Sequence, residues 1–242
     1  MTSLEGQTVL VTGASKGMGR EMALRFADEG AKVVLVARDG DELDDVAQEA
    51  NGETLVATAD VRNPQEVEAT VDVALDEFGS IDTLVNNAGV GLLSLYDERK
   101  DLVDVSEEDW DTVIETNLKG VFLFTKYVLP SMESGGNIIN ISSGLGRKAA
   151  EGWSPYVTSK WGLEGLTRTV ALEVEDDGVN VNGLYPGGRV ETGFWKHLPG
   201  EERDEILPPD VMNDAAVLLA QQDENGVTGE SISADDWEER LG

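Results

Sequence analysis

Cysteine is absent from the sequence and histidine occurs once, at His197, and these absences exclude several kinds of chemistry. A chain without cysteine forms no disulfide framework, no thiolate metal site and no cysteine nucleophile. A single histidine cannot build a zinc site from histidine ligands, so we expect no bound metal. His197 lies in the segment "WKHLPG", where a solvated loop position is favoured over a contact with substrate.

Long apolar runs are also absent. No run approaches the ~18 residues that a membrane-spanning helix needs, although 40% of the residues are apolar, which is enough for a core. The N-terminal stretch "MTSLEGQTVLVTG" has no basic segment followed by an apolar one, so no secretion signal is predicted. We therefore expect a soluble cytoplasmic protein.

Basic residues are scarce, with 18 lysines and arginines against 48 aspartates and glutamates, for a formal net charge of −30. This charge repels nucleic acid and anionic membranes, so neither is expected as a partner. The acidic residues are spread along the chain, as in a solvated acidic surface. The magnitude favours a halophilic protein, whose self-repulsion is screened by salt, over a mesophilic protein that is merely acidic.

Short β-branched runs alternate with amphipathic segments. The expected strands are 8–13, 32–37, 54–61, 83–89, 137–142 and 179–186. The helical segments include 18–30, which ends at Gly30, and 63–79, with Pro64 near its start and Gly79 at its end. Apolar strands separated by helices indicate a parallel sheet covered on both faces. We expect an α/β fold over residues 1–242: one Rossmann-like domain with a doubly wound parallel sheet flanked by helices on both faces.

The first strand runs directly into a glycine-rich turn, in which Gly13, Gly17 and Gly19 precede a helix. Glycines at a strand-to-helix turn let the backbone approach a pyrophosphate, and the helix N-terminus supplies N–H donors. The turn therefore predicts a dinucleotide cofactor. The alternative is a tight crossover without a ligand.

The end of the second strand indicates which dinucleotide is bound. NAD sites usually place a carboxylate there, whereas this strand ends at Ala37, followed by Arg38. Lys16, in the glycine turn, can approach the same region. Two cations and a missing acid favour the 2′-phosphate of NADP. NAD remains possible, because Asp39 could accept a ribose hydroxyl.

Tyr156 and Lys160 are four residues apart, and Ser143 lies thirteen residues before the tyrosine. On a helix, this spacing places the phenol and the amine on one face. A free phenol has a pKa of about 10, and a neighbouring ammonium lowers the pKa towards a range useful for proton transfer. The pattern fits a general acid/base, and its alternative is an ordinary solvated helix start.

The chain resembles the short-chain dehydrogenase/reductase family, closely over residues 5–195 and loosely beyond. The matching motifs occur in order: "TGASKGMG" (12–19), "DV" (60–61), "NNAG" (86–89), "TN" (116–117), "SS" (142–143), "YVTSK" (156–160) and "PG" (186–187).

The resemblance implies catalytic roles for Asn117, Ser143, Tyr156 and Lys160. Tyr156 is the implied acid/base and Lys160 binds the nicotinamide ribose. Ser143 holds the substrate oxygen, and Asn117 anchors a water beyond the lysine. The implied cofactor contacts are Gly13, Ser15, Lys16, Gly17, Met18, Gly19, Arg38, Asp60, Val61, Asn87, Ala88, Gly89, Tyr156, Lys160, Pro186, Gly187 and Thr192. Asp60 is implied to accept from adenine, Asn86 to steady the central strand, and Thr192 to contact the carboxamide.

The chain departs from the family pattern in three places. The stretch before Trp110 is longer and charged, and it is either a pocket rim or a solvated loop. "PGGRVET" carries one extra residue before Thr192. The substrate loop, about 187–210, and the C-terminal tail, 227–242, look short and atypical. We expect a homodimer or homotetramer, with a dimer formed through the helices that follow "TN" and "YVTSK".

Together these features predict an NADP(H)-dependent oxidoreductase that interconverts a ketone and a secondary alcohol, with a 3-oxoacyl-type ketoreductase favoured. The alternatives are a sugar or polyol dehydrogenase and a cofactor-binding regulatory protein without turnover. The partner is a small carbonyl or alcohol substrate. Trp153, Phe194 and Trp195 form either an apolar wall for substrate or ordinary packing. Trp161 is expected to pack against a helix or subunit, and Arg189 to form a salt bridge.

Overall fold

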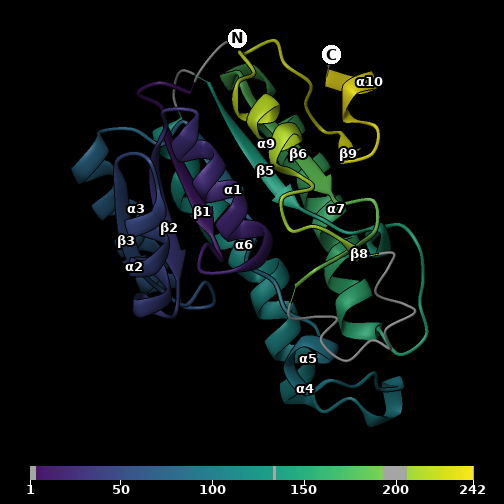
Figure 1. Ribbon diagram of the computed structural model, residues 1–242. Coiled ribbons are helices and arrows are strands. Elements are labelled where there is room, and N and C mark those ends of the chain that lie inside the picture. The colour runs from purple at the N-terminus through teal and green to yellow at the C-terminus, as the bar shows by residue number, and fades with distance from the viewer. Residues whose placement is uncertain (1–3, 133–134, 193–205, 242) are drawn as a thin grey trace.

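The computed structural model describes residues 4–132, 135–192 and 206–241 (Figure 1). Seven parallel strands form the central sheet in the order β3–β2–β1–β4–β5–β6–β9. Their bounds are β1 Thr8–Thr12, β2 Lys32–Ala37, β3 Thr54–Thr58, β4 Thr83–Asn86, β5 Gly136–Ile141, β6 Val179–Tyr185 and β9 Ser231–Ser233. A separate pair joins β7 (Arg189–Val190) to β8 (Ile206–Leu207). The sheet confirms the predicted doubly wound architecture.

Helices cover both faces of this sheet (Figure 1). One face carries α1 (Gly17–Asp28), α2 (Gly40–Glu49) and α9 (Asn213–Ala220), and the other carries α3 (Pro64–Phe78), α6 (Gly120–Val128) and α7 (Ser154–Glu173). The shorter helices are α4 (Leu92–Tyr96), α5 (Glu107–Ile114) and α10 (Trp237–Leu241), with a π-helical turn η2 (Glu115–Lys119) and 3₁₀ turns η1 (Leu102–Asp104), η3 (Leu129–Ser131), η4 (Gly144–Gly146) and η5 (Glu175–Asp177). None of the helices in the described ranges is long and apolar enough to cross a membrane.

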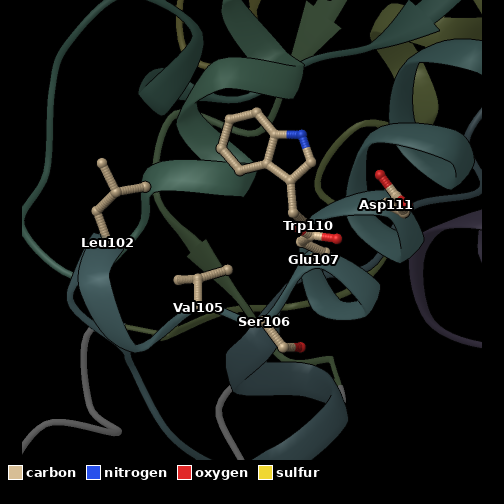
Figure 2. Close-up of a pocket in the computed structure, with 6 residues that line it drawn as sticks. All are labelled: Leu102, Val105, Ser106, Glu107, Trp110 and Asp111. Atoms are coloured by element: carbon tan, nitrogen blue, oxygen red, sulfur yellow. The ribbon is translucent and has the colours of Figure 1, made fainter.

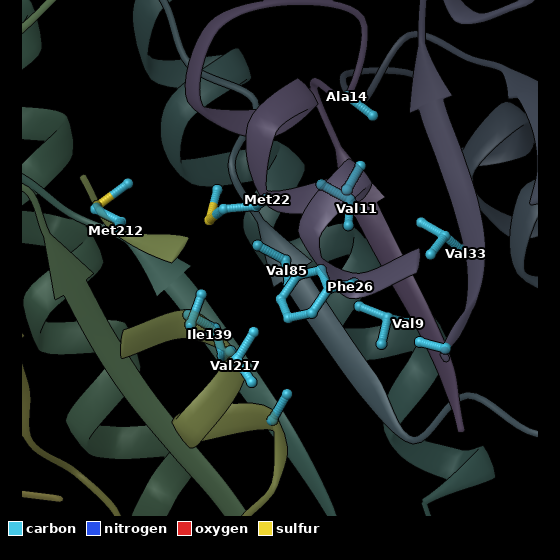
Figure 3. Close-up of a cluster of buried hydrophobic side chains, with 14 of the residues drawn as sticks. Val9, Val11, Ala14, Met22, Phe26, Val33, Val85, Ile139, Met212 and Val217 are labelled. Carbon is cyan, nitrogen blue, oxygen red and sulfur yellow. The ribbon is translucent and has the colours of Figure 1, made fainter. Parts of the chain in front are cut away.

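The alternation of side chains along the strands builds two buried layers. On β1, Val9 and Val11 join the core beneath α1, while Leu10 joins the core on the opposite face. Figure 3 shows the first layer, where Phe26 and Met22 of α1 meet the sheet. Because both faces are covered, β1, β4, β5 and β6 are buried at nearly every position.

Several predicted ends are confirmed and others are wrong. Helix α3 is capped by Asn63, whose side chain accepts from the Gln65 N–H, and it ends at Gly79, with φ of 84°. Strand β3 stops at Thr58, not residue 61, because the chain turns and the Asp60 N–H donates to Glu66. Strand β4 stops at Asn86, not residue 89, because the following residues hydrogen-bond to Thr12.

The strand order reverses direction at β1, which pairs with β2 on one side and with β4 on the other. Open α/β sheets bind ligands outside the carboxyl ends of the strands at such a reversal. The glycine turn follows β1 and residues 87–90 follow β4, so both lie at this position.

Candidate active site

The glycine turn is a cradle with no space for side chains. A Cβ on Gly19 would overlap the Gly13 carbonyl oxygen and the Asn87 side-chain nitrogen. A Cβ on Gly13 would lie 2.9 Å from the Ala88 Cα, and Gly13 and Gly17 have φ of 67° and 57°. Only glycine fits this backbone path, and α1 begins in the turn at Gly17, where the first N–H groups of a helix lack an acceptor within the helix and can bind an anion. The cradle thus fits the pyrophosphate of a dinucleotide.

Thr12 and Asn87 lock the ends of β1 and β4 together. The Thr12 hydroxyl accepts from the N–H groups of Asn87 and Ala88, at 3.0 and 3.1 Å. The Asn87 amide donates to the carbonyl oxygens of Thr12 and Gly13, at 3.0 and 3.1 Å. Below them, Asn86 donates to Asn140 across the sheet. These contacts place the sequence-predicted Asn87 and Ala88 against the glycine turn.

The two cations expected to select the cofactor are Lys16, in the glycine turn, and Arg38, just after the end of β2. Lys16 is 80% exposed and its nitrogen is 3.8 Å from Glu42. Arg38 is exposed directly after β2, and within the described ranges it has no ion-pair partner inside 4 Å. Asp39 does not point to a ligand: it caps α2 by accepting from the Glu42 N–H. The geometry thus leaves Arg38 available for an anion.

Asp60 and Val61 follow β3, where the neighbouring Arg62 binds the Asp60 carboxylate. Arg62 holds the Asp60 carboxylate through Nε at 3.0 Å and an Nη atom at 2.6 Å. This hydrogen bonding by Arg62 lowers the pKa of Asp60. Val61 is buried, and a Cβ on Gly120 would lie 2.8 Å from its methyl group. Sequence reasoning missed Arg62, although it lies two residues from Asp60.

Asn117 lies fully buried in the π-helical turn between α5 and α6. Its side chain accepts from the Val90 N–H and donates to the Val90 carbonyl, both at 2.8 Å, and donates to Ser159 at 3.1 Å. A Cβ on Gly89 would lie 3.5 Å from the Asn117 oxygen and 3.8 Å from Lys160 Nζ. Because π turns recur at functional sites, the local helix distortion itself marks this position.

Ser143 and Tyr156 meet at the carboxyl end of β5. Ser143 opens the 3₁₀ turn after this strand, and its hydroxyl accepts from the Leu145 N–H at 3.2 Å. Tyr156 lies in the first turn of α7 and its phenol is hydrogen-bonded to the Ser143 side chain. Trp153 is 8% exposed and packs edge-to-face on the Tyr156 ring, with centroids 5.6 Å apart.

Lys160 is buried one turn beyond Tyr156. Its ammonium lies 5.7 Å from the centre of the tyrosine ring and donates to the Ile141 carbonyl at 2.7 Å. Burial lowers the pKa of Lys160 to about 8, and the charge of Glu164 opposes this change. A lysine near this pKa exchanges protons close to neutral pH.

The expected effect of Lys160 on the phenol is not produced by these side chains alone. Burial raises the pKa of Tyr156, and the Ser143 hydrogen bond lowers it. Desolvation disfavours the phenolate, and the Lys160 ammonium is directed to the Ile141 carbonyl.

Thr192 lies against the glycine turn, whereas the "PG" motif meets the C-terminal tail. The Thr192 methyl carbon would be 3.4 Å from a Cβ placed on Gly17, so the extra residue in "PGGRVET" does not remove Thr192 from this region. Gly187 has φ of 78°, and a Cβ there would overlap the Asp235 carboxylate. The C-terminal tail therefore packs directly against Gly187.

The remaining candidates are surface residues, or they lie outside the described residues. Trp161 is 52% exposed on α7, and Arg189 lies exposed on β7. Phe194, Trp195 and His197 lie outside the described residues. The long stretch before Trp110 contacts the loop leading to α7, since a Cβ on Gly152 would lie 2.9 Å from the Arg99 Cβ.

A separate pocket of about 310 Å³ opens beside this long stretch (Figure 2). It is lined by Leu102, Val105, Ser106, Glu107, Trp110 and Asp111. None of the sequence-predicted catalytic or cofactor residues lines it, so it is distinct from the cluster around Tyr156.

Comparisons with known proteins agree with this geometry. The family model described as short chain dehydrogenase matches residues 7–203. A 3-oxoacyl-[acyl-carrier-protein] reductase of Thermotoga maritima is 36% identical, covering 96% of this chain and 97% of that protein. The (2S)-[(R)-hydroxy(phenyl)methyl]succinyl-CoA dehydrogenase subunit BbsD of Thauera aromatica is also 36% identical, covering 95% of each chain.

A solved structure gives the same result in three dimensions. The 3-ketoacyl-(acyl-carrier-protein) reductase of Brucella melitensis, complexed with NADH, superposes with a TM-score of 0.87 at 31% identity, covering 96% of this chain and 97% of that one. With the glycine cradle, the seven-stranded sheet and the Ser143–Tyr156–Lys160 cluster in place, the chain belongs to the short-chain dehydrogenase family and is an NAD(P)-dependent oxidoreductase.

Proposed function

We propose that the protein is an NADP(H)-dependent ketoreductase that interconverts a ketone and a secondary alcohol, with 3-oxoacyl compounds as the favoured substrates. One observation carries the proposal: the Tyr156 phenol is hydrogen-bonded to Ser143 and lies one helical turn from the buried Lys160 ammonium, beside a glycine cradle. This combination supplies a proton donor, an oxygen-binding hydroxyl and a cofactor site in one place.

The cofactor is held by the turn from Gly13 to Gly19 and by the residues after β4. When bound, the reduced nicotinamide would supply a hydride to the carbonyl carbon, and the oxidised ring left by that transfer would carry a positive charge. Arg38 and Lys16 favour NADP, because both cations lie beyond the end of β2 or in the turn, and a 2′-phosphate pairs strongly with such groups. Thr192 is the proposed contact for the carboxamide.

The chain's own residues perform the proton transfer. Tyr156 donates its phenolic proton to the carbonyl oxygen in reduction and removes it from the alcohol in oxidation. The Ser143 hydroxyl hydrogen-bonds the same oxygen and stabilises its developing negative charge. The Lys160 ammonium, 5.7 Å from the ring centre, would favour the phenolate that remains, together with the positive charge of the oxidised nicotinamide. Asn117 donates to Ser159, which hydrogen-bonds the Tyr156 carbonyl, and also holds the backbone of Val90.

The substrate class is drawn from the relatives. Several proteins at about 36% identity are named 3-oxoacyl-[acyl-carrier-protein] reductases, and one is named a dehydrogenase of a succinyl-CoA derivative. The compounds in these names all carry a carbonyl or a hydroxyl group on an acyl chain. A sugar or polyol substrate is the alternative within the same reaction.

The assembly that we propose is a homodimer through α6 and α7. Phe122 on α6 is 47% exposed, and Trp161 and Leu172 on α7 are 52% and 75% exposed. Burying such apolar side chains against a second copy stabilises association. We also propose a halophilic origin, which the net charge of −30 supports. The proposed location is the cytoplasm.

The test is a substrate panel followed by NADPH or NADH absorbance in molar salt. The panel contains 3-oxoacyl thioesters, simple ketones and keto-sugars. Wild type should reduce the thioesters fastest with NADPH, and Tyr156→Phe should lose at least about 100-fold in kcat. The matched control is Tyr127→Phe on α6, which should keep the wild-type rate. Equal slow rates in wild type and Tyr156→Phe contradict the enzymatic proposal, and faster turnover of keto-sugars contradicts the substrate class.

A further inference from the structure

A buried carboxylate lies one helical turn beyond Lys160, and the proton transfer described above does not use it. This residue, Glu164, has a side chain that is 6% exposed. Within the described residues, Lys160 is the buried cation, and Glu164 and Asp109 are the buried acids. Asp109 lies on α5 and is paired with Lys100, whereas Glu164 shares α7 with Lys160. Acids are buried only where partners stabilise them.

Glu164 joins three parts of the fold. Its Oε1 accepts from the Ser142 hydroxyl at 2.5 Å and from the Ser231 hydroxyl at 2.8 Å. Ser142 immediately precedes Ser143, and Ser231 begins β9. The carboxylate therefore ties the turn that carries Ser143 to both the catalytic helix and the last strand of the sheet.

The surrounding backbone leaves room for this carboxylate. A Cβ on Gly146 would lie 3.1 Å from Glu164 Cγ and 3.2 Å from both the Lys160 carbonyl oxygen and the Ser142 hydroxyl. A Cβ on Gly183 of β6 would lie 3.2 Å from the Ser231 hydroxyl and 3.7 Å from the carboxylate. Two glycines thus permit a charged group where apolar packing would otherwise be expected.

The charged groups around Glu164 are two arginines and the buried Lys160, all of them cations. Arg168 on α7 is 3.4 Å away, and Arg147, after η4, is 3.9 Å away and also donates to the Tyr185 hydroxyl of β6. Both arginines are partly exposed, so solvent screens them. On the buried side, Glu164 acts on Lys160, where its charge opposes the effect of burial. The buried anion therefore offsets part of the effect of burial on the lysine.

We propose that Glu164 is a positioning residue, which fixes the Ser143 turn against α7 and supplies the buried negative charge that keeps Lys160 protonated beside the phenol. The inference rests on the proposed roles of Tyr156 and Lys160. Glu164 itself touches neither substrate nor cofactor, and it acts through Ser142 and through its field at the lysine.

The test compares the pH profiles of wild type, Glu164→Gln, Glu164→Asp and Glu173→Gln. Gln is isosteric and neutral, Asp keeps the charge, and Glu173, at the exposed end of the same helix, controls for loss of one charge. Removing a negative charge lowers the pKa of every group near it. In Glu164→Gln the alkaline limb of ketone reduction and the rising limb of alcohol oxidation should both move about one unit to lower pH. Glu164→Asp and Glu173→Gln should stay near the wild-type profile.

A second readout does not depend on turnover. The ultraviolet absorbance of tyrosinate, taken as the difference between each protein and its Tyr156→Phe derivative, follows the ionisation of Tyr156 directly. This titration should also move to lower pH in Glu164→Gln. If that variant does not fold, Arg168→Gln replaces it, since removing a cation at 3.4 Å from Glu164 should move both readouts a few tenths of a unit upward.

The outcomes separate the two proposals. An inactive Tyr156→Phe with unmoved profiles in Glu164→Gln contradicts the role of Glu164 and leaves the proposed function standing. A lower kcat without a pH shift reduces Glu164 to a packing residue. A fully active Tyr156→Phe contradicts the proposed function, while the tyrosinate titration still tests the charge coupling.

Discussion

At the scale of single residues, Lys160 shows what could and what could not be predicted from the sequence. Its spacing from Tyr156 could be read from the sequence, but its hydrogen bond to the Ile141 carbonyl could not, because the end of β5 meets α7 only in the folded sheet. Asn117 and Ser143, in contrast, were predicted only by resemblance, since no local pattern joins them to Tyr156. Arg62 and Glu164 had local signals, two residues after Asp60 and four after Lys160, and both were missed.

Burial of Lys160 predicts that stability rises with pH above neutrality. The pKa of Lys160 is about 8 in the folded protein and about 10.4 in an unfolded chain. Between these values the unfolded chain holds a proton that the folded protein has released, so raising the pH favours the folded state. The free energy of unfolding of wild type, relative to Lys160→Met, should grow by roughly 1–3 kcal/mol from pH 7 to pH 10. Urea titrations at each pH measure it, and a constant difference contradicts the lowered pKa.

The position of Arg38 leads to a prediction about the choice between NADPH and NADH. Arg38→Ala removes a cation available for the 2′-phosphate, so the Kd for NADPH should rise about tenfold while the Kd for NADH stays the same. Fluorescence titration of both cofactors measures this, with Lys32→Ala, at the opposite end of β2, as the control. Equal losses for NADPH and NADH, or none, would show that Arg38 does not read the phosphate.

At the scale of elements, strand positions were predictable because β-branched runs mark buried parallel strands. The carboxyl ends of β3 and β4 were predicted too long, since their last residues turn away to bond with Glu66 and Thr12. Strand β9 was missed because three residues, Ser231–Ser233, show no periodicity, and its pairing with β6 is a long-range contact.

The turn between β1 and α1 gives a sharp prediction for one glycine. Gly19→Ala places a methyl group on the Gly13 carbonyl and the Asn87 amide, so the turn must open and its hydrogen bonds to β4 weaken. We expect a loss of about 2–4 kcal/mol in stability and loss of cofactor binding. Ser15→Ala in the same turn should change the stability of the cofactor-free protein by less than about 0.5 kcal/mol. Thermal melts compare the two, and a wild-type melting point for Gly19→Ala would contradict the crowding.

At the scale of the whole molecule, the main electrostatic feature is the net charge of −30. The expectation that it repels nucleic acid and anionic membranes rests on composition, because long-range repulsion depends on the sum of charges more than on their placement. Which acids find cations was not predictable. Arg25, for example, reaches Asp214 of α9 at 2.6 Å, from a helix nearly two hundred residues earlier.

Self-repulsion predicts strong stabilisation by salt. The Debye length falls from about 10 Å at 0.1 M to about 3 Å at 1 M, so repulsion among acidic residues is screened. The melting temperature should rise by about 10 °C between 0.1 and 1 M KCl. Differential scanning calorimetry measures the change. A melting temperature that is flat or falls over this range contradicts a fold limited by its own charge.

The central claim is that this site transfers a hydride to a carbonyl carbon while Tyr156 supplies the proton. NADPH deuterated at the reactive position of the nicotinamide, incubated with a 3-oxoacyl thioester, tests it by mass spectrometry of the product. We expect one deuterium on the carbinol carbon with wild type and with Tyr127→Phe, and no product above background with Tyr156→Phe. Product without deuterium, or labelled product at the wild-type rate from Tyr156→Phe, would contradict it.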